Sequence, residues 1–105
     1  MGNYVNTGAK GAAGELRVAV DLLARGYQVF RNMTPHGVDL VAYDLGQNQL
    51  FKVEVRTHVY RTEEGIVLLN TQEEATDRDV FGFAIPGEAV FYYPWGVITG
   101  TLGKP

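Results

Sequence analysis

Three acidic side chains in the first half of the chain could together bind a divalent metal ion: Glu15, Asp39 and Glu54. Two carboxylates held close together raise each other's pKa unless a cation lies between them. Carboxylate oxygens without neighbouring His or Cys suit Mg²⁺ or Mn²⁺ rather than zinc. A metal bound there could polarise a phosphoryl oxygen and activate a water molecule. The three acids therefore predict a magnesium or manganese site suited to phosphodiester hydrolysis.

Glu15 is predicted to lie on a helix. Apolar residues recur at helical spacing in ELRVAVDLLARGY, so one face of the helix is predicted to be apolar: Leu16, Ala19, Val20 and Leu23. Gly26 stands where a glycine C-cap belongs, with Arg25 in the last turn, so the helix should end there. Gly14 has no side chain and would let the helix approach a sheet closely. Glu15 could then add a third carboxylate or hold a metal-bound water.

Asp39 and Glu54 are predicted to lie on the two arms of a β-hairpin. The arms are VDLVAYD and LFKVEVRTHVY, separated by the turn-forming GQNQ. Strict alternation in the second arm puts Lys52, Glu54 and Arg56 on one face. The apolar neighbours of Asp39 make its charge costly unless it meets a cation or a cleft. A tight hairpin therefore brings Glu54 within reach of Asp39.

The remaining segments complete a mixed α/β layout. Residues 28–32 are predicted as a short strand before the hairpin, and residues 65–69 as a further strand. NTQEEATDRD, residues 70–79, contains a capping-box pattern and predicts a short helix. VFGFAI and AVFYY flank the turn signal PGE and predict a second hairpin. The order is helix, strands, short helix and strands.

The composition predicts one domain spanning residues 1–105. A chain of 105 residues with 46% hydrophobic content is too short to build two adequate cores. It contains no cysteine, which excludes a disulfide framework and a thiolate zinc site and suits a reducing, cytoplasmic compartment. Its longest apolar runs, VLL and AVFYY, are far shorter than a membrane span, and the N-terminal segment lacks a signal peptide's apolar region. No membrane association is predicted.

The net charge of -3 argues at first against a polyanionic partner. The distribution changes that expectation, because residues 1–61 hold seven Lys or Arg against five Asp or Glu. Three of those five acids are Glu15, Asp39 and Glu54, so a bound metal would leave this part of the chain basic. The alternative is that an acidic, asymmetric surface only aids solubility.

The order of these motifs resembles the PD-(D/E)XK nuclease superfamily, particularly its Holliday-junction-resolvase-like members. The matching motifs are GxxGE at residues 11–15, GY at 26–27, GVDLVAYD and KVEVRT, and the resemblance covers residues 8–57. It implies a restriction-endonuclease-like α/β core: an N-terminal helix, a three-stranded antiparallel meander, a short second helix and further strands in a mixed sheet. It also implies a magnesium-dependent endonuclease that hydrolyses phosphodiester bonds in DNA, with structure-specific cleavage as in resolvases.

The resemblance also assigns roles to individual residues. It makes Asp39, Glu54 and the backbone carbonyl of Val55 metal ligands, and Glu15 the helix carboxylate. Arg56 stands where the superfamily has a lysine. A guanidinium keeps its proton, with a pKa above about 12, so Arg56 can stabilise charge on a phosphate but cannot act as a general base. Lys52, on the same strand face, could supply part of the lysine's role.

Other residues are candidates for binding the same substrate. Lys10, Arg17 and Arg31 could contact phosphates, and His36, close before Asp39, could assist water activation. The aromatic run at residues 91–95 is predicted to pack in a core or an interface. A small domain offers little surface to a long duplex, so a homodimer is expected. Two alternatives stay open: a nuclease-like module that binds nucleic acid or oligomerises without cleavage, and a small structural protein whose carboxylates are surface charge.

Overall fold

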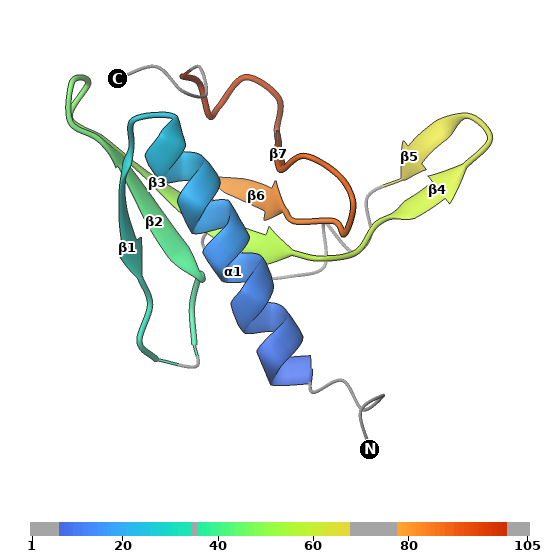
Figure 1. Cartoon of the computed structure of the whole chain (residues 1–105). Coiled ribbons are helices and arrows are strands. Elements are labelled where there is room, and N and C mark those ends of the chain that lie inside the picture. Colours follow the sequence, from blue (N-terminus) through green and yellow to red (C-terminus); the bar gives the residue numbers. More distant parts are fainter. Residues whose placement is uncertain (1–6, 35, 68–77, 101–105) are drawn as a thin grey trace.

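The computed structural model describes residues 7–34, 36–67 and 78–100, with the side chains in those ranges other than 7–10, 60–62 and 66–67. One helix, α1 (Thr7–Ala24), lies across one face of a five-stranded sheet (Figure 1). The sheet has the order β1-β2-β3-β6-β7, and its strands are Gln28–Arg31, Leu40–Asp44, Gln49–Arg56, Val80–Phe83 and Phe91–Tyr93. The predicted α/β class with an N-terminal helix and a mixed sheet is confirmed.

The first three strands form the predicted antiparallel meander. β1 pairs with β2 and β2 with β3, with Leu40 opposite both Arg31 and Val53. The β2–β3 turn contains Asn48 at a φ of 51°, a left-handed conformation that asparagine tolerates better than most residues. β6 joins β3 in parallel and pairs antiparallel with β7, as the second predicted hairpin requires. The parallel pair makes the sheet mixed.

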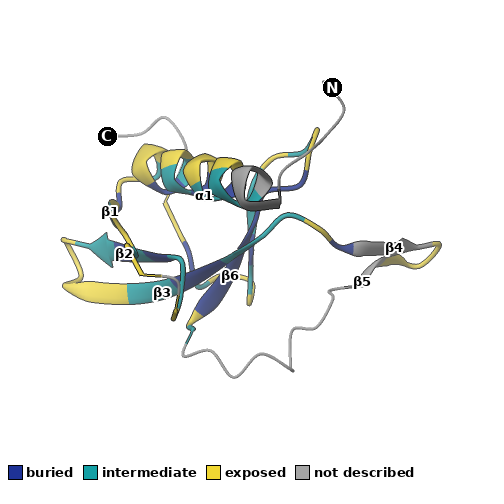
Figure 2. Cartoon of the chain, turned by 90° about the horizontal axis from the view of Figure 1, so that it is seen from below, coloured by how far each residue is buried: buried dark blue, intermediate teal, exposed yellow. Residues whose placement is uncertain are grey.

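A separate two-stranded hairpin extends from the end of β3. Its strands are β4 (Tyr60–Thr62) and β5 (Gly65–Val67), and it projects away from the main sheet (Figures 1 and 2). β5 coincides with the start of the strand predicted over residues 65–69. The short helix predicted over residues 70–79 lies outside the described residues, apart from Arg78 and Asp79, which lead directly into β6.

The residues that α1 buries most deeply against the sheet lie beside its predicted apolar face. Val18 and Leu22 are fully buried, whereas Leu16, Val20 and Leu23 are each more than half exposed. The close contact of the helix with the sheet at Gly14 explains which face is buried, because a β-carbon on Gly14 would lie 2.5 Å from Cγ2 of Thr57. The helix face that carries Gly14 can approach the sheet this closely because glycine has no β-carbon. The predicted role of Gly14 is confirmed. Of the four residues on the predicted apolar face, Ala19 packs against the core and the other three are exposed.

The helix also starts earlier than its apolar pattern suggested, at Thr7, so Glu15 lies in its middle. Its end was predicted correctly. Gly26 adopts a φ of 97°, its N–H donates to the Leu23 carbonyl at 3.0 Å, and Tyr27 donates to the Leu22 carbonyl at 3.1 Å. This is the pattern of a glycine-terminated helix.

Two hydrophobic clusters lie on opposite faces of the sheet. The larger lies beneath α1 and includes Val18, Leu22, Leu40, Val53 and Tyr92. The smaller consists of Val59, Phe81, Phe83 and Ile85, on the face that no described helix covers (Figure 2). β6 is therefore buried on both faces.

A partly buried polar contact ties the helix to the last strand. The Tyr92 hydroxyl donates to Oδ2 of Asp21 at 2.6 Å, and Nε of Arg25 donates to the same oxygen at 2.7 Å. Burial, with the Asp21 hydrogen bond and charge, raises the pKa of Tyr92 well above its ordinary value, so its hydroxyl keeps its proton. Among the described residues, no helix combines the length and apolar character needed to cross a bilayer.

Candidate active site

Asp39 lies at the point where β2 and β3 diverge. The last residue pair of their ladder at this end is Leu40 with Val53, so a further pair in hydrogen-bonding register would join Val38 to Val55. Instead, Oδ2 of Asp39 accepts the Val55 N–H at 2.7 Å. The carboxylate therefore takes the place of a main-chain acceptor and is held in the opening between the two strands.

Asn32 directs the chain that precedes Asp39. Its Nδ2 donates to the Val38 carbonyl at 2.8 Å, and its Oδ1 accepts the Thr34 N–H at 2.8 Å. Its backbone N–H donates to the Asp39 carbonyl at 3.1 Å. These bonds occupy the Val38 carbonyl and leave the Val55 N–H to Asp39. Sequence analysis missed this role, although an asparagine between a strand and a turn is a recognisable signal for such local bonds.

Glu15 approaches Asp39 from the helix side. Burial raises the pKa of the Glu15 carboxyl above its ordinary value, and the charge of Asp39 raises it further. Arg31 on β1 opposes this shift, with its Nε 3.6 Å from Oε1 of Glu15. The structure thus brings together Glu15, Asp39 and Arg31. Repulsion between two carboxylates is the condition that a bound cation relieves.

Glu54 lies on the face of β3 opposite the helix. Val53 and Val55 pack against the cluster beneath α1, and the alternation predicted for this strand is confirmed. Glu54 is nevertheless only 7% exposed, which a solvated strand face would not produce. Its Oε2 lies 2.8 Å from an Nη of Arg56, which neutralises the buried charge. The Arg56 guanidinium lies over the Phe81 ring, 5.4 Å from its centroid.

The three acids therefore approach one strand end from different sides. Leu40 and Val53 are partners in the β2–β3 ladder. Asp39 immediately precedes Leu40, and Glu54 immediately follows Val53. Glu15 comes from the helix side of the sheet and Glu54 from the other. Among the described residues, no group of three or more His, Cys, Asp or Glu side chains could hold a metal ion. The structure pairs Glu15 with Asp39, and Glu54 with Arg56, rather than forming one cage.

The backbone of Val55 points toward Asp39. In a β-strand the N–H and C=O of one residue point to the same side. Since the Val55 N–H reaches Asp39, its carbonyl is directed toward the β2 side as well. The carbonyls of Lys52 and Arg56 instead accept bonds from Asp79 and Ala84 at the β6 side. This orientation suits the ligand role predicted for the Val55 carbonyl, which stays a prediction.

The fold is similar to that of a known endonuclease. The structure matches that of a bacterial homing endonuclease with a TM-score of 0.63 and 19% sequence identity, over 90% of this chain and 72% of that one. No protein-family model matches the chain, and no curated protein matches it. The likeness establishes a shared fold.

The other predicted site residues are Lys10, Arg17, His36 and Lys52. Arg17 donates to the Ile85 carbonyl at 3.0 Å and to the Glu88 carbonyl at 2.6 Å, so it holds the loop between β6 and β7. His36 is exposed in the loop that Asn32 organises. Lys52 shares the strand face of Glu54 and Arg56. Lys10 lies in α1, but its side chain is outside the described part. Phosphate contacts by Lys10, Arg17 and Arg31 stay predictions.

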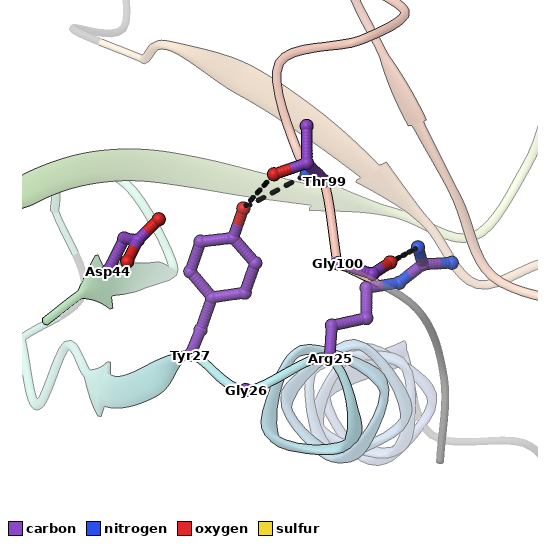
Figure 3. A pocket seen from close by; sticks show the side chains of 6 residues that line it. All are labelled: Arg25, Gly26, Tyr27, Asp44, Thr99 and Gly100. Atoms are coloured by element: carbon purple, nitrogen blue, oxygen red, sulfur yellow. Dashed lines mark hydrogen bonds between the residues drawn. The ribbon is translucent and has the colours of Figure 1, made fainter. Parts of the chain in front are cut away.

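Cavities lie beside the helix at two places in the described part of the chain. One of about 170 Å³ adjoins the candidate site, between α1 and the first two strands, with Glu15 and Arg31 among its lining residues. The other, of about 70 Å³, lies near the C-terminal end of α1 (Figure 3). There the Tyr27 hydroxyl accepts the Thr99 N–H at 2.9 Å, and Arg25 donates to the Gly100 carbonyl at 3.1 Å. Glu15 is ten residues from Arg25, about 15 Å along the helix, so this second cavity is separate from the candidate site.

Proposed function

We propose that this protein is a metal-dependent endonuclease that hydrolyses phosphodiester bonds in DNA, with the site architecture of the PD-(D/E)XK superfamily. The observation that carries the proposal is the Asp39 carboxylate, which is held by the Val55 N–H at the opening between β2 and β3. Glu15 adjoins it, and Glu54 and Arg56 follow on the neighbouring strand. The fold shared with a bacterial homing endonuclease supports the same class of activity. Branched DNA, the resolvase-like substrate, is the structure-specific target to test first.

The donor set suits Mg²⁺ or Mn²⁺. Asp39, Glu54 and the Val55 carbonyl would hold the ion, and all three supply oxygen ligands. Bound there, the ion would supply Lewis-acid polarisation of the phosphate and a more acidic water. For Glu54 to take part, its carboxylate must exchange the Arg56 guanidinium for the cation. That exchange would release Arg56 to bind the phosphate.

The chain's own residues perform the remaining steps. Arg56 stays protonated and stabilises negative charge that develops on the phosphate. Glu15, with its raised pKa, can accept a proton from the attacking water at a carboxylate oxygen. Lys52, on the same face as Arg56, adds positive charge beside the substrate. Arg31, half exposed on the edge strand beside Glu15, extends the phosphate-binding surface.

Cleavage of supercoiled, linear and branched DNA tests the proposal, with Mg²⁺ and with a chelator. The wild type should cleave only with the metal, and Asp39→Asn and Glu54→Gln should each lose activity. Asp44→Asn is a matched control, because Asp44 is at the far end of β2 from Asp39 and its carboxylate accepts the Gln47 N–H at 3.2 Å. Full activity in both site variants would refute the assignment.

A second candidate function is a nuclease-like module that binds nucleic acid without cleaving it. The Glu54–Arg56 ion pair favours it, because a stable pair would keep Glu54 from a metal. Metal-independent DNA binding, with no cleavage of any of the three substrates, would select this function over the first.

A homodimer is part of the proposal. Leu16, Val20 and Leu23 form an exposed apolar stripe on α1, with exposed fractions of 56%, 63% and 58%. Their spacing places them on one helix face, as in helix pairing. Val20→Glu should convert a dimer to a monomer in sedimentation equilibrium. A monomeric wild type would contradict this part of the proposal.

A further inference from the structure

The single tryptophan is held in an exposed, ordered position. Trp95 is 67% exposed, although an indole is costly to leave in water. Its ring stacks on Phe91, with centroids 5.9 Å apart and planes 25° apart. Phe91 stacks in turn on Phe83 at 4.8 Å and 12°, and the Tyr93 and Trp95 rings meet in a T-shaped arrangement at 5.7 Å and 86°. The indole is therefore supported from below and from one side, while much of its surface faces solvent.

This aromatic stack lies on the same sheet face as Glu54 and Arg56. The ladder pairs Glu54 with Phe81 and Arg56 with Phe83. The next ladder pairs Phe81 with Tyr93 and Phe83 with Phe91. Paired residues share a face, and each strand step is about 4.8 Å. The strand that precedes Trp95 is thus about 10 Å from β3, a length of about three stacked nucleotides at 3.4 Å each.

Two guanidinium groups lie over the Phe81 ring on this face, and one of them, Arg56, is paired with Glu54. Arg78 lies over the Phe81 ring, 4.1 Å from its centroid, and Arg56 lies over the same ring at 5.4 Å. Positive charge alternating with aromatic faces is the pattern by which proteins bind unpaired nucleotides, with cations at the phosphates and rings against the bases.

We propose that Trp95 stacks an unpaired nucleobase of the DNA whose phosphate lies at the candidate site. The inference rests on the proposed function and extends it, because it names the substrate class as DNA with an unpaired base a few nucleotides from the cleaved bond. Such bases occur in single strands, at branch points and where a base leaves the helix. Stacking tolerates any base, since each has a π face.

Trp95 fluorescence measures this contact directly, because the chain has no other tryptophan. The wild type is titrated in chelator with a single-stranded oligonucleotide, with the same oligonucleotide made abasic, and with a blunt duplex. Base stacking quenches the indole, so strong quenching is expected with the first and little with the other two. Fluorescence anisotropy of a labelled oligonucleotide should show binding weakened about tenfold in Trp95→Ala and largely retained in Trp95→Phe. Leu50→Ala is the matched control, an exposed apolar residue at the far end of β3.

The outcomes separate this inference from the proposed function. Quenching by bases without any DNA cleavage would support the inference and refute the nuclease proposal. Cleavage that is unchanged in Trp95→Ala, with no quenching by any oligonucleotide, would overturn the inference alone. An emission spectrum that shifts with protein concentration in the absence of DNA, and not on adding it, would show that a second copy covers Trp95, which also overturns it.

Discussion

Oδ2 of Asp39 accepts the backbone N–H of Val55 at 2.7 Å, across the opening between β2 and β3. This bond has two consequences. It joins the two strands where their regular ladder has ended, and it fixes the orientation of a carboxylate that would otherwise rotate freely. A ligand held in place before the metal arrives loses less conformational entropy on binding.

Asp39→Asn and Asp39→Ala should separate these two roles. An asparagine oxygen can still accept the Val55 N–H, so Asp39→Asn should fold normally while metal-dependent cleavage falls by on the order of 100-fold or more. Asp39→Ala should also lose about 2 kcal/mol of unfolding free energy, because a charge-assisted hydrogen bond is removed. Urea denaturation and DNA cleavage measure the two effects. Equal stability of the Ala variant and wild type would show that the bond contributes nothing to folding.

Gly14→Ala should reduce stability by about 1–3 kcal/mol, because the new methyl group would lie 2.5 Å from Cγ2 of Thr57. The clash should also displace Glu15, the next residue. Thr57→Ser removes Cγ2, so the double variant should recover most of the loss. Gly11→Ala is the control, since nothing lies within 4 Å of its β-carbon, and a helix gains about 0.5–1 kcal/mol from this change. Thermal unfolding of the four variants checks the set, and a harmless Gly14→Ala would contradict the close approach of helix and sheet.

Glu15→Gln should change stability in a pH-dependent way. The folded chain binds the Glu15 proton more tightly than the unfolded chain, because its pKa is raised above the ordinary value of 4.5. The unfolding free energy therefore falls as pH rises from about 4.5 through the folded pKa. In chelator, Glu15→Gln should match the wild type below pH 4.5 and melt at a higher temperature near pH 7. Glu63→Gln, an exposed carboxylate on the β4–β5 hairpin, should show no such difference. A Glu15→Gln variant that melts lower at pH 7 would contradict the raised pKa of Glu15, which arises from its burial and then from the charge of Asp39.

Arg56→Ala should impair both folding and activity. It leaves the Glu54 carboxylate, 7% exposed, without the guanidinium that now lies 2.8 Å away, and unpairing a buried charge costs about 3 kcal/mol or more. Cleavage should fall by on the order of 100-fold, because charge on the phosphate loses its partner. Arg56→Lys keeps a cation beside Glu54 and should retain stability to within about 1 kcal/mol. Activity that survives in Arg56→Ala, once the protein is folded, would remove Arg56 from the mechanism.

Local patterns along the chain predicted the strands well, because they depend on alternation and turn residues. The hairpin that carries Asp39 and Glu54, and the glycine stop of the helix, were readable for this reason. The buried face of the helix could not be predicted in this way. Leu16, Val20 and Leu23 have the same helical spacing as a core stripe, whereas the true face was selected by the close approach at Gly14. A pattern of apolar residues does not take glycine into account, so it cannot show that the face with Gly14 packs against the sheet.

The candidate site was predictable only in part, for a related reason. Asp39 was expected within the first arm of the hairpin, and the structure places it immediately before that strand, which begins at Leu40. The burial of Glu54 and its pairing with Arg56 depend on Phe81, which comes from a strand 25 or more residues later in the chain and adjoins β3 only in the folded sheet. The role of Asn32 depends on where the Val38 carbonyl points. Such contacts between distant segments leave no periodic pattern.

The central claim is that Asp39 and Glu54 share one divalent cation, although Glu54 is paired with Arg56 in its absence. A crystal structure of the wild type with Mn²⁺, using the anomalous scattering of manganese, tests this most directly. We predict one anomalous peak between the Asp39 and Glu54 carboxylates, within bonding distance of the Val55 carbonyl, and an Arg56 guanidinium that has moved away from Glu54. An intact Glu54–Arg56 pair with no manganese at Asp39, at a concentration that saturates binding in solution, would contradict the account.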